Sequence, residues 1–100
     1  MTDAGLEHIQ PLVHLEFLDL SNTQVTDAGL KRIEGLPELH SLSLDDTRIT
    51  DEGLKRLKGL KHLERLYTMG TQVTPAGWKE LKQALPNLRG LRSYDDGDQP

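Results

Sequence analysis

Apolar and polar positions alternate along this chain in two rhythms. One has helical spacing, as at Leu30, Ile33 and Leu36, and predicts a short helix with one buried face. The other is the strand alternation of Leu42 and Leu44, which predicts a β-strand with one buried face. The strand alternation returns at 15–20 and 63–68, so we expect repeated helix–strand units.

A five-residue motif marks the start of each predicted helix and returns every 24 residues. It reads Thr-Asp-Ala-Gly-Leu at 2–6 and 26–30, Thr-Asp-Glu-Gly-Leu at 50–54 and Thr-Pro-Ala-Gly-Trp at 74–78. A fixed period of this size is the signature of a solenoid, whose units bury their apolar faces against each other. We therefore expect one array over 1–96, with repeats at approximately 2–25, 26–49, 50–73 and 74–96, and a disordered tail at 97–100.

The residues of the motif indicate how each helix begins. The Thr26 hydroxyl can cap the helix, and Asp27 then lies at the positive end of the helix dipole. Pro75 is favoured at the first helical residue, which supports Thr74 as the cap of the last helix. Because a helix separates successive strands, the sheet should be parallel. Helices are wider than the strand spacing, so stacking should make the sheet side concave and the helix side convex.

The pattern L-x-x-L-x-L-x-x-T-x-[VI]-T-D-x-G-L resembles the leucine-rich repeat family. It is most similar to the short bacterial-type units and the related cysteine-containing subtype, and it covers Thr2 to about Asp96. The resemblance implies an α/β right-handed solenoid, a horseshoe segment with a concave parallel sheet, convex short α-helices and about four repeats. In the family, an Asn or Cys after the strand bonds the loop backbone. Thr23, Thr47 and Thr71 hold that position here, and their hydroxyls can do the same.

The two ends of the predicted array differ. The last unit has one extra residue at 81–85, and the large Trp78 is expected to cover that end of the core. The first helix has no such closure, although solenoids need polar terminal caps. Two interpretations are open: the chain is a piece of a longer array, or its first repeat associates end to end with another molecule.

Leucine-rich repeats generally bind through the concave sheet, so its exposed positions are the candidate site. Tyr and Arg also dominate binding hot spots. The alternative is that exposed aromatic residues reflect β-propensity alone. We expect Gly90 to occupy the register position of Arg65 in the last strand. The predicted partner-binding residues are Tyr67, Met69, Arg92 and Tyr94 first, and Phe17, Arg65, Asp19 and Asp45 second.

Histidine and glutamate alternate where the chain enters each strand, as His14 and Glu16, Glu38 and His40, and His62 and Glu64. Such a set could bind a metal or sense pH. Pairing of opposite charges between neighbouring strands is the favoured interpretation, because His14 and His62 should be two strand spacings apart, which is wide for one ion.

Basic residues should form a ridge on the convex side, at Lys31, Arg32, Lys55, Arg56, Lys58, Lys79 and Lys82. A phosphate backbone or an anionic membrane surface could bind such a ridge. Glutamates interrupt it and the chain carries a net charge of -4, so we favour a solvated face and predict no nucleic-acid partner. No apolar run approaches the roughly 20 residues that span a bilayer, so we predict no membrane insertion.

We predict that the chain is not an enzyme and needs no cofactor. It has no cysteine, no G-x-S-x-G elbow and no glycine-rich phosphate loop. No signal-peptide pattern precedes the first motif, which leaves the compartment open with the cytoplasm as the default. The predicted function is a module that binds a protein or peptide on its concave face. The alternative is a structural segment of a larger leucine-rich repeat protein, of receptor, regulatory or ubiquitin-ligase-adaptor type, whose activity lies elsewhere.

Overall fold

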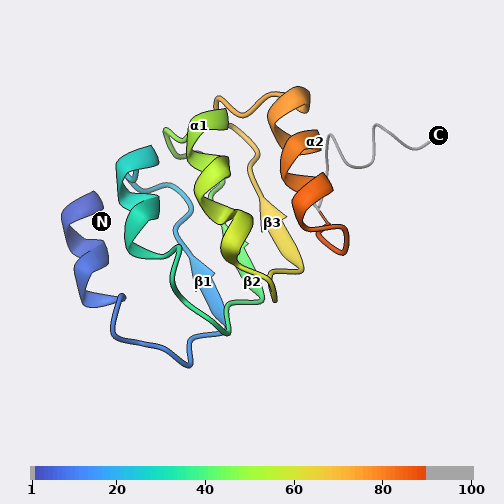
Figure 1. Ribbon diagram of the computed structural model, residues 1–100. Helices are drawn as coiled ribbons and strands as arrows, with labels where there is room; N and C mark the ends of the chain where they lie inside the picture. Colours follow the sequence, from blue (N-terminus) through green and yellow to red (C-terminus); the bar gives the residue numbers. More distant parts are fainter. Residues whose placement is uncertain (1, 90–100) are drawn as a thin grey trace.

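A computed structural model describes residues 2–89 and places short helices on one side of a parallel sheet (Figure 1). Strand and helix alternate along the chain, as the two hydrophobic rhythms predict. In chain order the elements are η1 (Asp3–His8), β1 (Phe17–Asp19), η2 (Asp27–Arg32), β2 (Ser41–Ser43), α1 (Asp51–Leu54), η3 (Lys55–Gly59), β3 (Arg65–Tyr67) and α2 (Pro75–Ala84).

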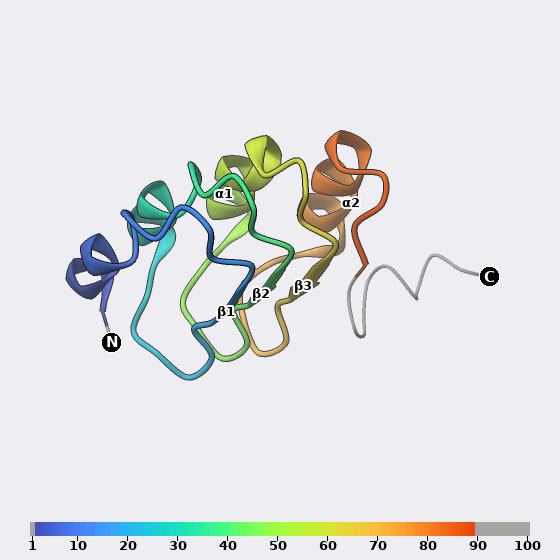
Figure 2. The same ribbon diagram turned by 90° about the horizontal axis from the view of Figure 1, so that it is seen from below.

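The three strands pair in sequence order and without register slip. Leu18, Leu42 and Leu66 are aligned across the sheet, and each strand is displaced from the next by one 24-residue period. Figure 2 shows the helices fanning out over the more closely spaced strands, which agrees with the expected concave sheet side. Four full repeats are not confirmed, because most of the expected fourth strand lies outside the described residues.

The core lies between the sheet and the helices and consists of columns of equivalent residues. Leu42 and Leu66 are completely buried, while the residues on either side of them in β2 and β3 are at least partly exposed. Complete burial of one such leucine contributes roughly 1.5–3 kcal/mol. One column begins each helix and is at most 2% exposed in every repeat; it consists of Leu6, Leu30, Leu54 and Trp78.

The prediction of α-helices is wrong for the first two repeats. η1 and η2 are 3₁₀ helices, α1 has a single α-helical turn before η3, and only α2 is α-helical over ten residues. A 3₁₀ helix rises about 2.0 Å per residue against 1.5 Å for an α-helix. A 3₁₀ helix therefore spans a greater length with the same number of residues between two strands. The last repeat carries an extra residue, which allows the more compact α-helix.

The predicted caps and loop bonds are confirmed for the inner repeats. The hydroxyls of Thr26, Thr50 and Thr74 each accept a backbone N–H in the first turn of the helix that follows. The loop threonines also bond their own loop. Their hydroxyls donate to the carbonyl three residues earlier at 2.6–2.7 Å, from Thr23, Thr47 and Thr71.

The two edges of the described array differ in how well the core is covered. At the carboxyl edge, Trp78 is 2% exposed, and no described residue accepts a hydrogen bond from its indole N–H. At the amino edge, Leu12 is 49% exposed, whereas its equivalents Leu36 and Leu60 are 2% and 3% exposed. The described core is therefore well buried at the carboxyl edge, where Trp78 lies within it, and partly exposed at the amino edge.

Candidate functional site

The concave face is the side of the sheet that the helices leave uncovered. Strand alternation turns the residues on either side of each central leucine toward this face. Phe17 is 64% exposed and Met69, just beyond β3, is 49% exposed. The concave face is defined here by Phe17, Asp19, Ser41, Ser43, Asp45, Arg65, Tyr67, Met69 and Arg89.

The structure brings four of the eight predicted site residues, Phe17, Arg65, Asp19 and Tyr67, into two rows across the strands. One row runs from Phe17 through Ser41 to Arg65. The second runs from Asp19 through Ser43 to Tyr67. Large side chains therefore stand at both ends of the concave face, with two small serines between them. This leaves a shallow central strip where an extended segment could lie against the sheet.

Two of the predicted binding carboxylates accept hydrogen bonds from backbone N–H groups. Asp45 accepts a hydrogen bond from the Met69 N–H at 2.8 Å, which links the second repeat to the third. Asp19 accepts from the Ser21 N–H at 2.9 Å. Hydrogen bonds from the Ser21 side chain and backbone lower the pKa of the Asp19 carboxyl. Both residues therefore have a structural role that the sequence pattern did not reveal.

The predicted register of the last strand is wrong by one residue. Arg89, not Gly90, forms the parallel bridge with Arg65, and its N–H donates to the Glu64 carbonyl at 2.8 Å. The extra residue in the last helix had suggested a shift of one position. Arg89 is a concave-face residue that the sequence analysis missed, and the basic side chain beside a buried Leu88 was the available signal. Arg92 and Tyr94 lie outside the described residues, so their role stays a prediction.

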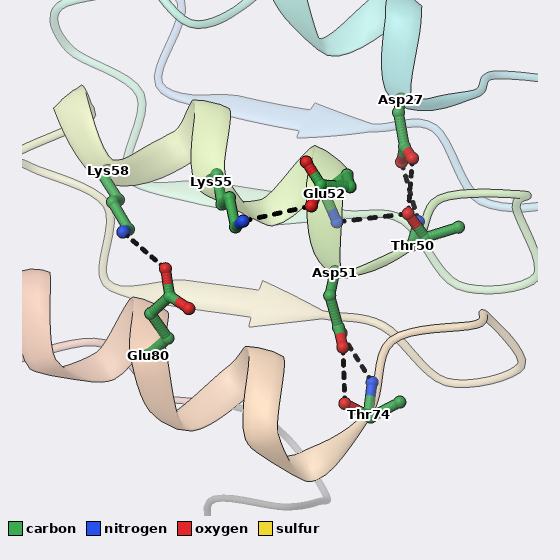
Figure 3. Close-up of polar contacts among 8 residues, drawn as sticks. All are labelled: Asp27, Thr50, Asp51, Glu52, Lys55, Lys58, Thr74 and Glu80. Carbon is green, nitrogen blue, oxygen red and sulfur yellow. Dashed lines mark hydrogen bonds and ion pairs between the residues drawn. The ribbon is translucent and has the colours of Figure 1, made fainter.

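An aspartate of each repeat clamps the cap of the next one. The Asp27 carboxylate accepts from the Thr50 N–H at 2.7 Å and from the Thr50 hydroxyl at 2.5 Å. Asp51 holds Thr74 in the same way, at 2.8 Å and 2.5 Å, as Figure 3 shows for both pairs. Asp3 makes the equivalent bonds to Thr26. The motif aspartate is thus an inter-repeat clamp, and not only a partner of its own helix dipole.

The motif glycine makes room for this clamp. A Cβ atom at Gly29 would collide with the Asp3 carboxylate, and one at Gly53 would collide with Asp27. Gly77 stands against Asp51 in the same way. Threonine, aspartate and glycine of the motif are therefore accounted for by helix capping and repeat stacking. None of them needs to be assigned to a ligand.

Of the histidines and glutamates at the strand entrances, His14 and Glu38 form the lateral pair that the sequence predicts. His14 Nδ1 donates to a carboxylate oxygen of Glu38 at 3.1 Å across the repeat boundary. His40 Nδ1 donates to the Glu38 carbonyl at 2.9 Å, and the His40 and His62 rings are 5.9 Å apart. Within residues 2–89, no three histidines or carboxylates are grouped so that they could hold a metal ion.

The basic residues of the convex side are largely paired with glutamates. Arg32 lies 4.0 Å from Glu7, and Arg56 lies 3.6 Å from Glu34. Figure 3 shows Lys55 bonded to Glu52 and Lys58 bonded to Glu80. The bond to Glu52 raises the pKa of Lys55, and the bond to Lys58 lowers the pKa of Glu80. This pairing favours the solvated-face interpretation of the convex ridge over a phosphate-binding one.

A groove of about 650 Å³ between η2 and α1 also lies on the convex side. The charged groups along it are engaged with each other or with the clamp, through Asp27, Glu34, Glu52, Lys55 and Arg56. It therefore offers little charge to an outside ligand. None of the helices in the described part of the chain is both long and apolar enough to cross a membrane.

Residues 13–55 match the family described as Leucine Rich repeats (2 copies). The matched stretch includes β1, η2 and β2, so it supports a leucine-rich repeat protein with an α/β fold. Such repeats are generally protein-interaction modules and typically lack enzymatic activity. The match does not distinguish the cysteine-containing subtype. No curated protein matches the chain.

Proposed function

We propose that this protein binds a protein or peptide partner on its concave face. The observation that carries this proposal is the exposure of Phe17 and Met69 on the sheet side that no helix covers. Large apolar side chains on a surface lose unfavourable hydration when a partner covers them. Arg65 and Tyr67 lie on the Met69 side of the same face, and tyrosine and arginine dominate binding hot spots. Arg92 and Tyr94 remain predicted contacts of the same surface.

The arrangement of the face supports an extended partner. The serines of β2 keep the middle of the sheet low, between Phe17 at one end and Arg65 and Tyr67 at the other. A deep enclosed pocket would suit a small molecule better than a peptide. The concave face has no such pocket among the described residues. A peptide strand of a partner could place side chains against both ends.

A quantitative affinity capture tests the proposal. The bait is the wild-type chain beside a Phe17→Ala/Tyr67→Ala variant and a convex control, Lys31→Ala/Lys79→Ala, each checked for folding by circular dichroism. We expect at least one protein to be retained by the wild type and by the convex control and lost by the concave variant. Equal retention by all three baits would contradict the proposal.

A second candidate is that the array is a structural segment, stacked on another leucine-rich unit through its first repeat. The exposure of Leu12 favours it, because Leu36 and Leu60 at the same repeat position, each with a repeat before it, are buried. Ile9, Leu15 and Leu18 are also only partly buried. A second copy of this chain is a less suitable occupant, because Pro75 replaces the aspartate that would clamp Thr2.

Adding one repeat tests this candidate. A copy of residues 26–49 placed directly before Thr2 puts a motif aspartate at the clamp position and leucines over Leu12. The control is the same copy with its buried leucines replaced by serine. We expect the added repeat to raise the free energy of unfolding and the control to leave it unchanged. If both leave it unchanged, the edge does not accept a leucine-rich unit. Concentration-dependent sedimentation would instead identify a second copy as the occupant.

A further inference from the structure

Two arginines occupy neighbouring positions on the concave face. Arg65 in β3 and Arg89 form a parallel bridge, so their Cβ atoms lie about one strand spacing, 4.8 Å, apart. Like charges placed side by side on a sheet are destabilising. The other members of the same row are the uncharged Phe17 and Ser41, so the repeat pattern does not demand a charge here.

In the described part of the chain, the charges of this pair are not matched by an ion pair. Neither arginine forms an ion pair within residues 2–89, although Glu64 lines the same pocket. The arginines of the helices behave differently, since Arg32 and Arg56 each lie beside a glutamate of the preceding repeat. Within residues 2–89, Arg65 and Arg89 therefore lack the inter-repeat ion pairs that the arginines of the convex side form.

The two arginines also line one open pocket of about 500 Å³, at the edge where β3 meets the last described residues. Lys82 and the Glu64 side chain belong to the same pocket, so three basic groups surround one carboxylate. Guanidinium groups bind carboxylates through two parallel hydrogen bonds, which makes such a pair selective for acidic side chains. Tyr67 follows Arg65 by two residues and faces the same side.

We propose that Arg65 and Arg89 form the recognition site for an acidic peptide segment of the partner. The inference rests on the proposed function and gives the partner a chemistry. Alternate residues of an extended peptide lie about 6.6–6.8 Å apart on one side. Long arginine side chains span that distance from adjacent strands, so acidic residues at positions i and i+2 fit the pair. Tyr67 would contact the backbone or an apolar residue next to them.

An acidic peptide fits the surroundings better than a nucleic acid. The chain has a net charge of -4, and Asp19 and Asp45 occupy the same face toward β1 and β2. A long polyanion would meet these carboxylates, while a short acidic segment can stay on the arginine side. The convex lysines that could extend a phosphate-binding track, Lys55 and Lys58, are already paired with glutamates.

Fluorescence polarisation with two labelled peptides tests the inference. One peptide alternates glutamate and serine over ten residues, and the other has glutamine in place of each glutamate. The proteins are the wild type, Arg65→Gln/Arg89→Gln, and the matched convex control Lys31→Gln/Lys79→Gln, which removes the same charge. We expect the glutamate peptide to bind the wild type and the control, with affinity falling as salt rises, and to bind the arginine variant at least tenfold more weakly.

Each other outcome has a defined meaning. Equal affinity for the wild type and the arginine variant would overturn the inference, as would equal binding of the glutamine peptide or no binding of either peptide. Competition by a DNA duplex that is stronger than competition by the unlabelled glutamate peptide would overturn the choice of partner class. If the capture experiment with Phe17→Ala/Tyr67→Ala loses a partner while the arginines prove irrelevant, only this inference fails. If that capture also shows no loss, the proposed function fails as well.

Discussion

Replacing Asp27 with alanine should test whether the aspartate clamp holds the repeats together. The substitution removes a charged acceptor from two hydrogen bonds, to the Thr50 N–H and hydroxyl. A hydrogen bond to a charged group contributes about 1.5–3 kcal/mol when buried. Asp27 and Thr50 are both only half-buried, so solvent weakens each bond. We therefore expect a total loss of about 2–3 kcal/mol in the free energy of unfolding.

A loss of this size is easily measured in a small domain. For a chain of 60–100 residues, each kcal/mol shifts Tm by about 4–8 °C, so Asp27→Ala should lower Tm by roughly 10–20 °C. Asp27→Asn keeps an oxygen that can accept from the Thr50 N–H and should lose about half as much. Asp51→Ala should cost less than Asp27→Ala, because its partner Thr74 is exposed. The matched control is Glu52→Ala, an exposed residue beside Asp51 in the first turn of α1, which should change stability by less than about 0.5 kcal/mol.

A double-mutant cycle separates the clamp from the helix dipole. Asp27 also stands in the first turn of η2, where a negative charge is favourable by itself. The dipole explanation predicts additive effects of Asp27→Ala and Thr50→Val, because it does not involve Thr50. The clamp predicts a coupling free energy of about 1 kcal/mol or more. Urea unfolding of the four proteins would refute the clamp if the effects add, or if Asp27→Ala costs no more than Glu52→Ala.

Three further outcomes follow from the structure and can be measured with the same chain. Gly53→Ala places a methyl group against the clamp carboxylate and should cost about 1–3 kcal/mol in urea unfolding, while Gly59→Ala, whose Cβ meets no atom within 4 Å, should be neutral or slightly stabilising. Leu36→Ala should cost about 2–5 kcal/mol as a core deletion, and the equivalent Leu12→Ala much less, unless another molecule covers that edge. The pKa of the Asp19 carboxyl, followed by NMR, should lie below its ordinary value, and Ser21→Ala should raise it. Because the pKa of Asp19 is lower in the folded than in the unfolded state, its ionised carboxyl stabilises the fold at pH values above the unfolded-state pKa. This stabilisation is lost as pH falls through the folded-state pKa.

The fold was predictable where a residue's role depends on its own repeat. The period of Leu30, Ile33 and Leu36 gave the buried helix face, and the alternation around Leu42 gave the strand. The caps followed from the hydroxyl of Thr26 and its equivalents. These features need only local chemistry and spacing, which the sequence carries directly.

The features that were missed depend on how one repeat meets the next. The bond from Thr50 to Asp27 joins residues 23 positions apart, and its geometry appears only when the repeats are stacked. The joint recurrence of the motif aspartate and glycine was a signal, because the glycine admits the carboxylate. The same limit explains Arg89, since one extra helical residue hid its alignment with Arg65 until the strands were paired.

The clamp makes the two ends of the array different. The proposed stacking edge and the proposed arginine site lie toward opposite ends. Each inner repeat offers an aspartate toward the carboxyl end and receives one on its threonine, but the last motif has Pro75 and can only receive. Among the described residues the core at that end is buried, Trp78 included, and a further unit stacked there would lack the clamp. The first repeat differs, since Leu12 is 49% exposed and the Thr2 side chain makes no cap hydrogen bond to the first turn of η1. The proposed stacking would use the amino edge, while Arg65 and Arg89, which form no ion pair within residues 2–89, lie at the far side of the sheet. A partner bound at the arginines would leave the amino edge free, so the two surfaces can be occupied at once.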